Sequence, residues 1–425
     1  MIFHQRLFKE AAMRNLESRI PLRNAATGVI LLLLASTGIF AQSSGPRTLE
    51  ELKAETQKRV DRNVAPAGGL KSEDAREALA SIHSLDRDEW AVAWSAIGDR
   101  YANRAATEES SDKSKAQQDY LLAWRYYSFA RWPTPNSPGK VKAYEKALAA
   151  FRSYARFLDP PMETVRIPFE GKEIVGYLRL PNGVRPAPLV LTISALDSRK
   201  EESAQGDAAL LRNGIGFFAV DMPGTGEAPI KVDVGAERMF SNILDYLATR
   251  SEIDSKRILV RSISWSGYWA AKLAYIERAR IRGAVIQGGP VDGYFTPEWQ
   301  KSGLNTDEYL FDLFPARAAI YGVKTLDEFL AYGPRLSLKA EGYLGKPAVP
   351  MLIVNGVKDT QVPIADLYAL LQSGGSAKEA WVNPDGGHTG RSEEWPNSRI
   401  FEEIILPWIK ARLAPDTQVS RAQRE

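Results

Sequence analysis

Apolar residues recur at spacings of three and four positions between residues 73 and 158. The stretches SEDAREALASIHSL, DEWAVAWSAIGDRYANRA, QQDYLLAWRYYSFARW and GKVKAYEKALAAFRSYARFL share this spacing, with a break rich in Pro, Asn and Ser at 133–139. Such spacing places apolar side chains on one face of an α-helix. We therefore expect a helical domain of about four helices over residues 73–160.

After Pro160 the pattern changes to short apolar runs bounded by turn residues. These runs are TVRIPF, EIVGYLRL, PLVLTIS, GFFAVD, RILVRSIS, GAVIQGG and MLIVNG, and segments of helix length separate the later ones. The alternation is typical of the α/β class, with a mostly parallel sheet and helices on both faces. PLVLTIS, FFAV and ILV are apolar without alternation, as expected of strands covered on both faces. We predict an α/β domain over residues 161–415 and a polar tail at 416–425.

The N-terminal region has a different composition. Residues 25–41, AATGVILLLLASTGIFA, form an uncharged apolar run that follows a basic segment and ends in small residues. This is the layout of a secretory signal, so we expect residues 1–41 to be a signal peptide and the protein to be periplasmic or secreted. The run is shorter than the roughly 20 residues of a membrane-spanning helix, so we expect no stable membrane insertion after signal removal. An N-terminal membrane anchor is the alternative, and the polar residues 42–72 predict a linker or leader.

Charge and composition exclude several classes of partner. The chain has 55 basic and 52 acidic residues, and the small excess lies within the first 41 positions. A balanced chain without basic blocks gives no electrostatic footprint for nucleic acid. The absence of Cys excludes disulfides and cysteine-based sites, and with three histidines, no P-loop and no G-x-G-x-x-G turn we expect neither a metal nor an organic cofactor. We expect a small-molecule substrate as the partner and leave a homodimer open.

The stretch RILVRSISWSGYWAAKLAYIERAR at 257–280 carries the strongest chemical signal. A buried strand turns there directly into an amphipathic helix, which is the context of a nucleophile elbow. The turn needs small residues two positions before and two after the nucleophile, and Ser264 has Ser262 and Ser266 at these positions. If Ser262 were the nucleophile, Val260 would occupy the position two before it, and if Ser266 were, Tyr268 would occupy the position two after it. Ser264 is therefore the candidate nucleophile, and capping serines at an ordinary strand end are the alternative.

A serine nucleophile needs an adjacent base, and histidine is the usual one. His4 lies in the signal region and His83 on a predicted helix, whereas His388 lies in the loop NPDGGHTG between a strand-like AWV and the last predicted helix. Asp359 follows the strand MLIVNG at the carboxyl edge of the predicted sheet, where active groups of α/β folds gather. The order Ser264, Asp359, His388 is the hydrolase order of nucleophile, acid and base. We predict that these residues form a catalytic triad.

Acyl transfer also requires two N–H donors directed at the developing oxyanion. We expect the backbone N–H of Trp265, next to the nucleophile, and that of Leu196, in the loop after PLVLTIS. Aromatic side chains expected at the pocket rim are Tyr126, Tyr127, Tyr268, Tyr294 and Trp299. They would suit a flat aromatic or polyketide-like substrate, although such side chains more often belong to a core.

These motifs resemble the α/β-hydrolase superfamily over about residues 165–415. DMPGTGEAP at 221–229 looks like the turn after its fourth strand, and SISWSGYWA at 262–270 looks like its elbow. YYSFARWP at 126–133, KAYEKALAAFRSYA at 142–155 and LDSRKEE at 196–202 are similar to a narrower branch. That branch contains 2,6-dihydroxypseudooxynicotine hydrolase, fungal hydrolases that shorten polyketide pigment precursors, and fermentation-respiration-switch-like esterases.

The resemblance implies that the helical domain is an N-terminal cap over the active site. It also implies cleavage of an ester or, in some members, of a carbon-carbon bond beside a ketone, with the same triad. The branch usually carries glycine where Ser194 and Ala195 stand, which weakens the assignment of the second oxyanion donor. We therefore predict a serine hydrolase that cleaves a carboxylic ester through an acyl-enzyme. A carbon-carbon hydrolase is the alternative, and a non-catalytic exported binding protein is a remote one.

Overall fold

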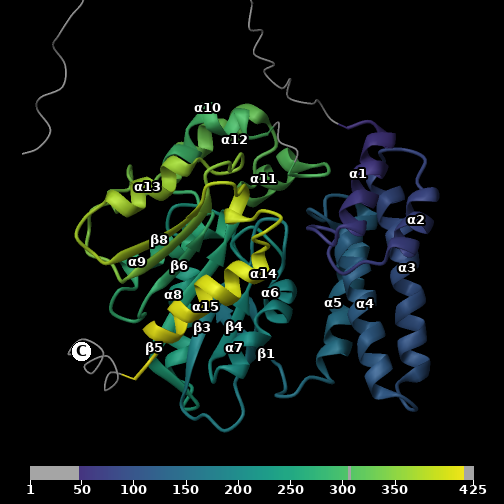
Figure 1. Cartoon of the computed structure of the whole chain (residues 1–425), viewed down its shortest axis with the longest axis horizontal. Coiled ribbons are helices and arrows are strands. Elements are labelled where there is room, and N and C mark those ends of the chain that lie inside the picture. Colours follow the sequence, from purple (N-terminus) through teal and green to yellow (C-terminus); the bar gives the residue numbers. More distant parts are fainter. Residues whose placement is uncertain (1–46, 305–307, 416–425) are drawn as a thin grey trace, which may run out of the picture. The chain divides into compact units, whose positions relative to one another are not determined.

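The structure is a computed structural model that describes residues 47–304 and 308–415 (Figure 1). The expected signal peptide at 1–41 and the polar tail at 416–425 lie outside these residues. Within the described ranges, no helix combines the length and the apolar character that crossing a bilayer requires.

The first part of the described chain is helical. Between residues 47 and 160 it contains α1 (Leu49–Asp61), α2 (Ser72–Ala80), α3 (Arg87–Glu108), α4 (Lys113–Arg131) and α5 (Pro138–Ala155). Helix α1 lies in the segment 42–72 that we expected to be a linker. It begins with a capping box between Thr48 and Glu51 and buries Leu52 and Val60. The linker prediction is therefore wrong for residues 49–61, because a local cap and two apolar contacts are enough to order a largely polar helix.

A sheet of eight strands forms the second part (Figure 1). The strands are β1 (Glu163–Phe169), β2 (Lys172–Arg179), β3 (Ala187–Ile193), β4 (Gly216–Val220), β5 (Ile253–Ile263), β6 (Ala284–Gln287), β7 (Met351–Gly356) and β8 (Lys378–Asn383). Their order is β1-β2-β4-β3-β5-β6-β7-β8. β1 and β2 pair antiparallel with their neighbours, and all pairs from β4 to β8 are parallel. The predicted α/β class with a mostly parallel sheet is confirmed.

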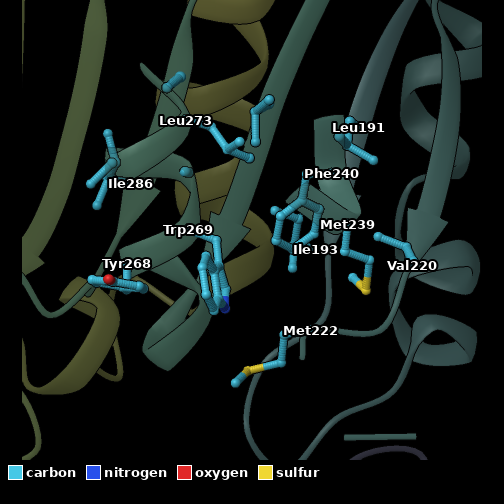
Figure 2. Close-up of a cluster of buried hydrophobic side chains, with 14 of the residues drawn as sticks. Leu191, Ile193, Val220, Met222, Met239, Phe240, Tyr268, Trp269, Leu273 and Ile286 are labelled. Atoms are coloured by element: carbon cyan, nitrogen blue, oxygen red, sulfur yellow. The ribbon is translucent and has the colours of Figure 1, made fainter. Parts of the chain in front are cut away.

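Helices cover both faces of this sheet. One face packs on α8 (Arg238–Ala248), α9 (Gly267–Ile276), α11 (Leu313–Tyr321) and α13 (Ile364–Gln372), and the other on α6 (Lys200–Gly206), α7 (Ala208–Arg212) and α15 (Leu406–Arg412). Figure 2 shows the first of these cores, in which Leu191 and Ile193 of β3 lie near Phe240 of α8. Shorter helices lie in the connections after β6 and β8, namely α10 (Pro297–Ser302), α12 (Leu326–Tyr332) and α14 (Asn397–Ile400). Both sheet faces are covered, which explains why the strand sequences lack alternation.

The helical part shares a core with the second face of the sheet. Phe151 of α5 packs on Tyr177 of β2, with ring centroids 5.4 Å apart, and also on Trp124 of α4 at 5.1 Å. The apolar cluster that contains these rings continues to Leu259 of β5. The helical part is therefore packed against the strand layer that carries the candidate nucleophile at its end.

Candidate active site

The backbone at Ser264 is in the left-handed region. Ser264 directly follows β5, with φ of 59°, and precedes α9. Ser266 is fully buried, and its hydroxyl donates to the carbonyl of Ile263 at 2.8 Å. At the first position of α9, a Cβ on Gly267 would come within 2.3 Å of the Cα of Gly289. Small residues are required here because the turn presses against the loop after β6.

Ser264, His388 and Asp359 form a continuous hydrogen-bonded chain. The Oγ atom of Ser264 lies 2.7 Å from Nε2 of His388, and Nδ1 of His388 lies 2.9 Å from Oδ2 of Asp359. With Nδ1–H donating to the carboxylate, Nε2 is free to accept the serine proton. The structure therefore brings together all three residues that the sequence placed in this order.

The carboxylate of Asp359 is buried and fixed in one orientation. Its Oδ1 accepts from the N–H groups of Gln361 at 2.7 Å and Val362 at 3.0 Å, and its Oδ2 accepts from Asn355 at 2.9 Å. Burial raises the pKa of this carboxyl, but His388 and the hydrogen bonds outweigh that effect and hold the pKa below its ordinary value. Asp359 is therefore ionised at neutral pH and can orient the imidazole.

The loop that carries His388 is bonded to the ends of two strands, β6 and β8. Thr389 adopts a positive φ of 66°, and its carbonyl accepts from the side-chain amide of Gln287 at the end of β6. The carbonyl of Gly390 accepts from Asn383 at the end of β8, at 2.9 Å. Ties to two strand ends hold the histidine at the same edge of the sheet as Ser264.

A cavity of about 480 Å³ opens onto Ser264 and His388. Its other lining residues include Pro66, Trp132, Ala195, Asp197, Ser198, Glu202, Tyr309 and Arg391. No sequence pattern marks these residues individually, although Trp132 lies within YYSFARWP and Asp197 within LDSRKEE. Tyr309 lies in a segment with no helix, strand or motif pattern, so no signal in the sequence marked it.

Among the described residues, no group of three His, Cys, Asp or Glu side chains could hold a metal ion.

The two expected oxyanion donors occupy the predicted loops. Trp265 follows Ser264, and Leu196 lies between β3 and α6, with both side chains buried. Within the described part of the chain, neither backbone N–H donates to another backbone carbonyl outside regular elements. The neighbours Ala195 and Asp197 line the cavity, so the Leu196 peptide lies at its wall.

Two of the expected pocket aromatics belong to the core of the helical part. The hydroxyl of Tyr126 donates to Asp74 at 2.6 Å, and its ring stacks on Tyr101 with centroids 5.4 Å apart. The hydroxyl of Tyr127 donates to Asp99 at 2.6 Å. Neither residue lines the cavity at Ser264, which corrects the expected role. Their helix face points toward α2 and α3 and not toward the sheet.

The other three expected aromatics are also displaced from the cavity at Ser264. Tyr268 donates to Glu341 at 2.8 Å, and Tyr294 is buried against Phe295 with ring centroids 5.2 Å apart. Trp299 lines a neighbouring cavity of about 940 Å³ that also reaches Asp359. Tyr268 lies on the buried face of α9, so the prediction that it contacts substrate is corrected as well.

Comparison with known proteins identifies the family of this chain. The family model described as "Esterase FrsA-like" matches residues 59–385 of the chain. The chain belongs to the FrsA-like esterase family. Esterase FrsA of Vibrio cholerae serotype O1 is 26% identical over 315 residues, covering 71% of this chain and 73% of that one. The alpha/beta hydrolase ucsC of an Acremonium species is 26% identical over 254 residues, covering 52% of this chain and 51% of that one.

Solved structures support the same fold for this FrsA-like chain. The crystal structure of 2,6-dihydroxy-pseudo-oxynicotine hydrolase matches with a TM-score of 0.68 at 22% identity, covering 85% of this chain and 95% of that one. AbyA5 matches with a TM-score of 0.65 at 23% identity, covering 89% and 98%. The predicted branch of the α/β-hydrolase superfamily is confirmed, and the FrsA-like family identifies the protein as a hydrolase of the esterase type.

Proposed function

We propose that the protein is a serine hydrolase that cleaves a carboxylic ester through an acyl-enzyme. The contact that carries this proposal is the one between the Ser264 hydroxyl and Nε2 of His388, with Asp359 behind the imidazole. A serine hydroxyl becomes an effective nucleophile when a base held in one tautomer takes its proton. The same contact opens into a cavity of a size suited to a small molecule.

In the first half of the proposed reaction, His388 takes the proton of Ser264 while Oγ attacks the ester carbonyl carbon. The N–H groups of Trp265 and Leu196 are the proposed donors to the oxyanion that forms. His388 then gives its proton to the leaving alcohol as the bond to the acyl carbon breaks. In the second half, His388 takes a proton from water as the water attacks the acyl carbon. His388 then gives that proton to Oγ of Ser264 as the bond between Oγ and the acyl carbon breaks, and the carboxylic acid is released.

The substrate is proposed to carry an aromatic or polyketide-like group. Supporting this, the rings of Trp132 and Tyr309 both line the cavity, with centroids 5.2 Å apart at an interplanar angle of 31°. Two flat rings of this kind offer apolar area to a planar group. A panel of aryl and alkyl esters with leaving groups of equal reactivity tests the proposal, and a clear preference for the alkyl esters would contradict it.

A fluorophosphonate probe tests the mechanism directly. Intact mass followed by peptide mapping is expected to show one modification, at Ser264, in the wild type. His388→Ala should abolish labelling, whereas His83→Ala, at an exposed position of the helical part, should leave it unchanged. Ser264→Ala should abolish hydrolysis of a nitrophenyl ester while the fold is retained. Unchanged turnover in Ser264→Ala, or cleavage of a β-diketone but of no ester, would overturn the proposal.

We infer from residues 25–41 that the enzyme is exported and that its signal is removed. Fractionation of cells that express the full chain, followed by N-terminal sequencing of the product, tests this. A mature N-terminus near residue 42 in the periplasm or medium is expected. An intact N-terminus in the membrane fraction would favour the anchored form instead.

A further inference from the structure

The loop from Ser194 to Arg199 is held in place by hydrogen bonds to its carbonyl groups. Nη1 of Arg199 donates to the carbonyl of Leu196 at 3.2 Å, and Nη1 of Arg131 donates to the carbonyl of Asp197 at 2.5 Å. The N–H of Ala195 donates to Oγ of Ser198 at 2.9 Å. Because a peptide unit is planar, these two carbonyls fix the N–H groups of Asp197 and Ser198, which lie in the same units. The unit that carries the N–H of Leu196 lies between the tethered N–H of Ala195 and the tethered carbonyl of Leu196.

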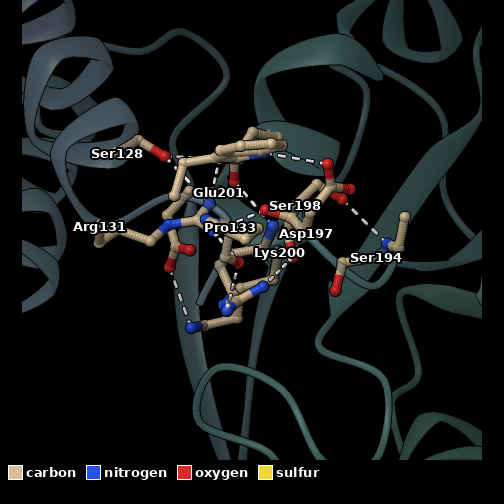
Figure 3. Close-up of polar contacts among 12 residues, drawn as sticks. Ser128, Arg131, Pro133, Ser194, Asp197, Ser198, Lys200 and Glu201 are labelled. Carbon is tan, nitrogen blue, oxygen red and sulfur yellow. Dashed lines mark hydrogen bonds and ion pairs between the residues drawn. The ribbon is translucent and has the colours of Figure 1, made fainter. Parts of the chain in front are cut away.

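One of these two guanidinium groups comes from the helical part. Arg131 is the last residue of α4 and is 1% exposed, and the next residue, Trp132, donates from Nε1 to Oδ2 of Asp197 at 3.0 Å. Asp197 is therefore held at both its carbonyl and its carboxylate by consecutive residues of another part of the fold. Figure 3 shows Arg131 and Asp197 with the polar contacts between the helical part and this loop.

Glu202 reinforces the same contact. Its Oε1 accepts from Nη2 of Arg131 at 2.7 Å and from the hydroxyl of Ser128 at 2.6 Å, while its Oε2 accepts from the N–H of Arg199 at 2.8 Å. One carboxylate thus bridges α4 and the end of the loop. Moving the loop would take the carbonyl of Asp197 away from the buried guanidinium of Arg131, which is unfavourable for a buried donor.

We propose that Asp197 is a positioning residue that, through Arg131 and Trp132, fixes the loop of the second oxyanion donor. Oxyanion donors lower the barrier only when they are already oriented, and a displacement of 1 Å can cost about 100-fold in rate. Trp132 also lines the cavity, so the indole that bonds to Asp197 lies beside the space that a substrate would occupy. This inference rests on the proposed function, since it needs a tetrahedral intermediate on Ser264.

Matched substitutions test the proposal with a nitrophenyl ester as substrate and an aryl boronic acid as the tetrahedral analogue. Asp197→Ala removes the acceptor of Trp132, and Asp197→Asn retains an oxygen that can accept the same bond. We expect Asp197→Ala to lower kcat by about 10- to 100-fold with KM within about twofold, and to weaken boronic acid binding in proportion. Asp197→Asn should recover most of the loss.

Substitutions of two tryptophans separate the effect of losing the bond between Trp132 and Asp197 from the effect of altered packing in the helical part. Trp132→Phe removes the N–H that reaches Asp197, whereas Trp90→Phe removes an indole bond to the carbonyl of Phe129, at 3.2 Å, elsewhere in the helical part. Trp132→Phe should lower kcat and boronic acid affinity together, and Trp90→Phe should leave both within twofold. If Trp132→Phe does not fold, the comparison of Asp197→Ala with Asp197→Asn decides alone.

The outcomes distinguish this inference from the function on which it rests. A wild type that neither hydrolyses the ester nor labels at Ser264 would remove the proposed function and this inference with it. A wild type that does both, with kcat retained in Asp197→Ala and Trp132→Phe, would overturn this inference only. A rise in KM alone, with boronic acid affinity unchanged, would show that Asp197 contacts the substrate and does not position the loop.

Discussion

Nε2 of His388 lies 2.7 Å from Oγ of Ser264, although 124 residues separate them in the chain. Ser264 follows β5, and His388 lies in the loop after β8, three places further along the parallel part of the sheet. Asp359, after β7, lies between them in sheet order. Each of the three residues is positioned by the end of a different strand. A substitution that weakens the hydrogen bonds between them should therefore leave the protein folded.

Asp359→Asn should leave the imidazole without its ionised partner. Because the carboxylate fixes the tautomer and stabilises the imidazolium, kcat for ester hydrolysis should fall by about 10⁴-fold. Asp385→Asn is the matched control, since Asp385 is exposed in the same region and pairs with Lys358 at 2.8 Å. Steady-state kinetics with thermal unfolding in parallel measure both. Activity within threefold of the wild type in Asp359→Asn would remove Asp359 from the mechanism.

Gly267→Ala should disturb the turn that carries Ser264. The new methyl group would lie 2.3 Å from the Cα of Gly289, which requires the backbone to shift. Overpacking of this kind costs about 1–3 kcal/mol in the free energy of unfolding, and kcat should fall with it. Gly375→Ala is the control, because no atom lies within 4 Å of the added carbon. Chemical denaturation and ester hydrolysis report the two effects, and a neutral Gly267→Ala would show that the elbow tolerates a side chain.

Lys140 should make stability depend on pH above neutrality. Burial lowers its pKa to about 8, from an ordinary value of 10.5, even though Asp312 favours the charged form. Between these pH values the unfolded chain binds more protons than the folded one, so the free energy of unfolding rises with pH. The contribution from this group should be about 2 kcal/mol between pH 8 and 9.5.

Denaturation of wild type, Lys140→Met and the exposed control Lys142→Met across this pH range checks the Lys140 prediction. The rise should disappear in Lys140→Met and persist in Lys142→Met. Equal slopes in all three proteins would mean that Lys140 keeps an ordinary pKa in the folded state.

Tyr126→Phe should affect stability and not catalysis. The hydroxyl of Tyr126 donates to Asp74 and accepts from the N–H of Lys71 at 3.0 Å, and Tyr126 does not line the Ser264 cavity. Its loss leaves a buried carboxylate with fewer donors, and should lower the free energy of unfolding by about 1–3 kcal/mol. Tyr368→Phe, at an exposed position, should change nothing. An altered KM in Tyr126→Phe would restore this tyrosine to the substrate pocket.

The fold class and the triad could be predicted because local sequence determines them. Strands covered on both faces have continuous apolar sequences, and the turn with positive φ at Ser264 requires small residues two positions before and two positions after the nucleophile. The order of Ser264, Asp359 and His388 follows from the strand ends on which they lie. With three histidines in the chain, the choice of the base was already narrow.

The cavity and the first helix could not be predicted in the same way. An aromatic residue on an amphipathic helix has the same spacing whether its face meets a substrate or another helix, so the sequence YYSFARWP does not separate the role of Tyr126 from that of Trp132. Only the structure shows that Tyr126, on α4, faces α3, whereas Trp132, directly after the end of α4, faces the cavity. Helix α1 is mostly polar because it buries only a narrow stripe, and its cap at Thr48 is a weak signal by itself.

The ion pairs of the helical part determine whether this part can be separated from the rest of the chain. Arg131 and Lys140 are almost completely buried there, but their acidic partners, Glu202 and Asp312, lie after residue 160. A fragment that ends at residue 160 would hold two cations with neither counter-charge. The helical part is therefore not a transplantable module: a chimera that grafts it onto another hydrolase would have to carry Glu202 and Asp312 across with it.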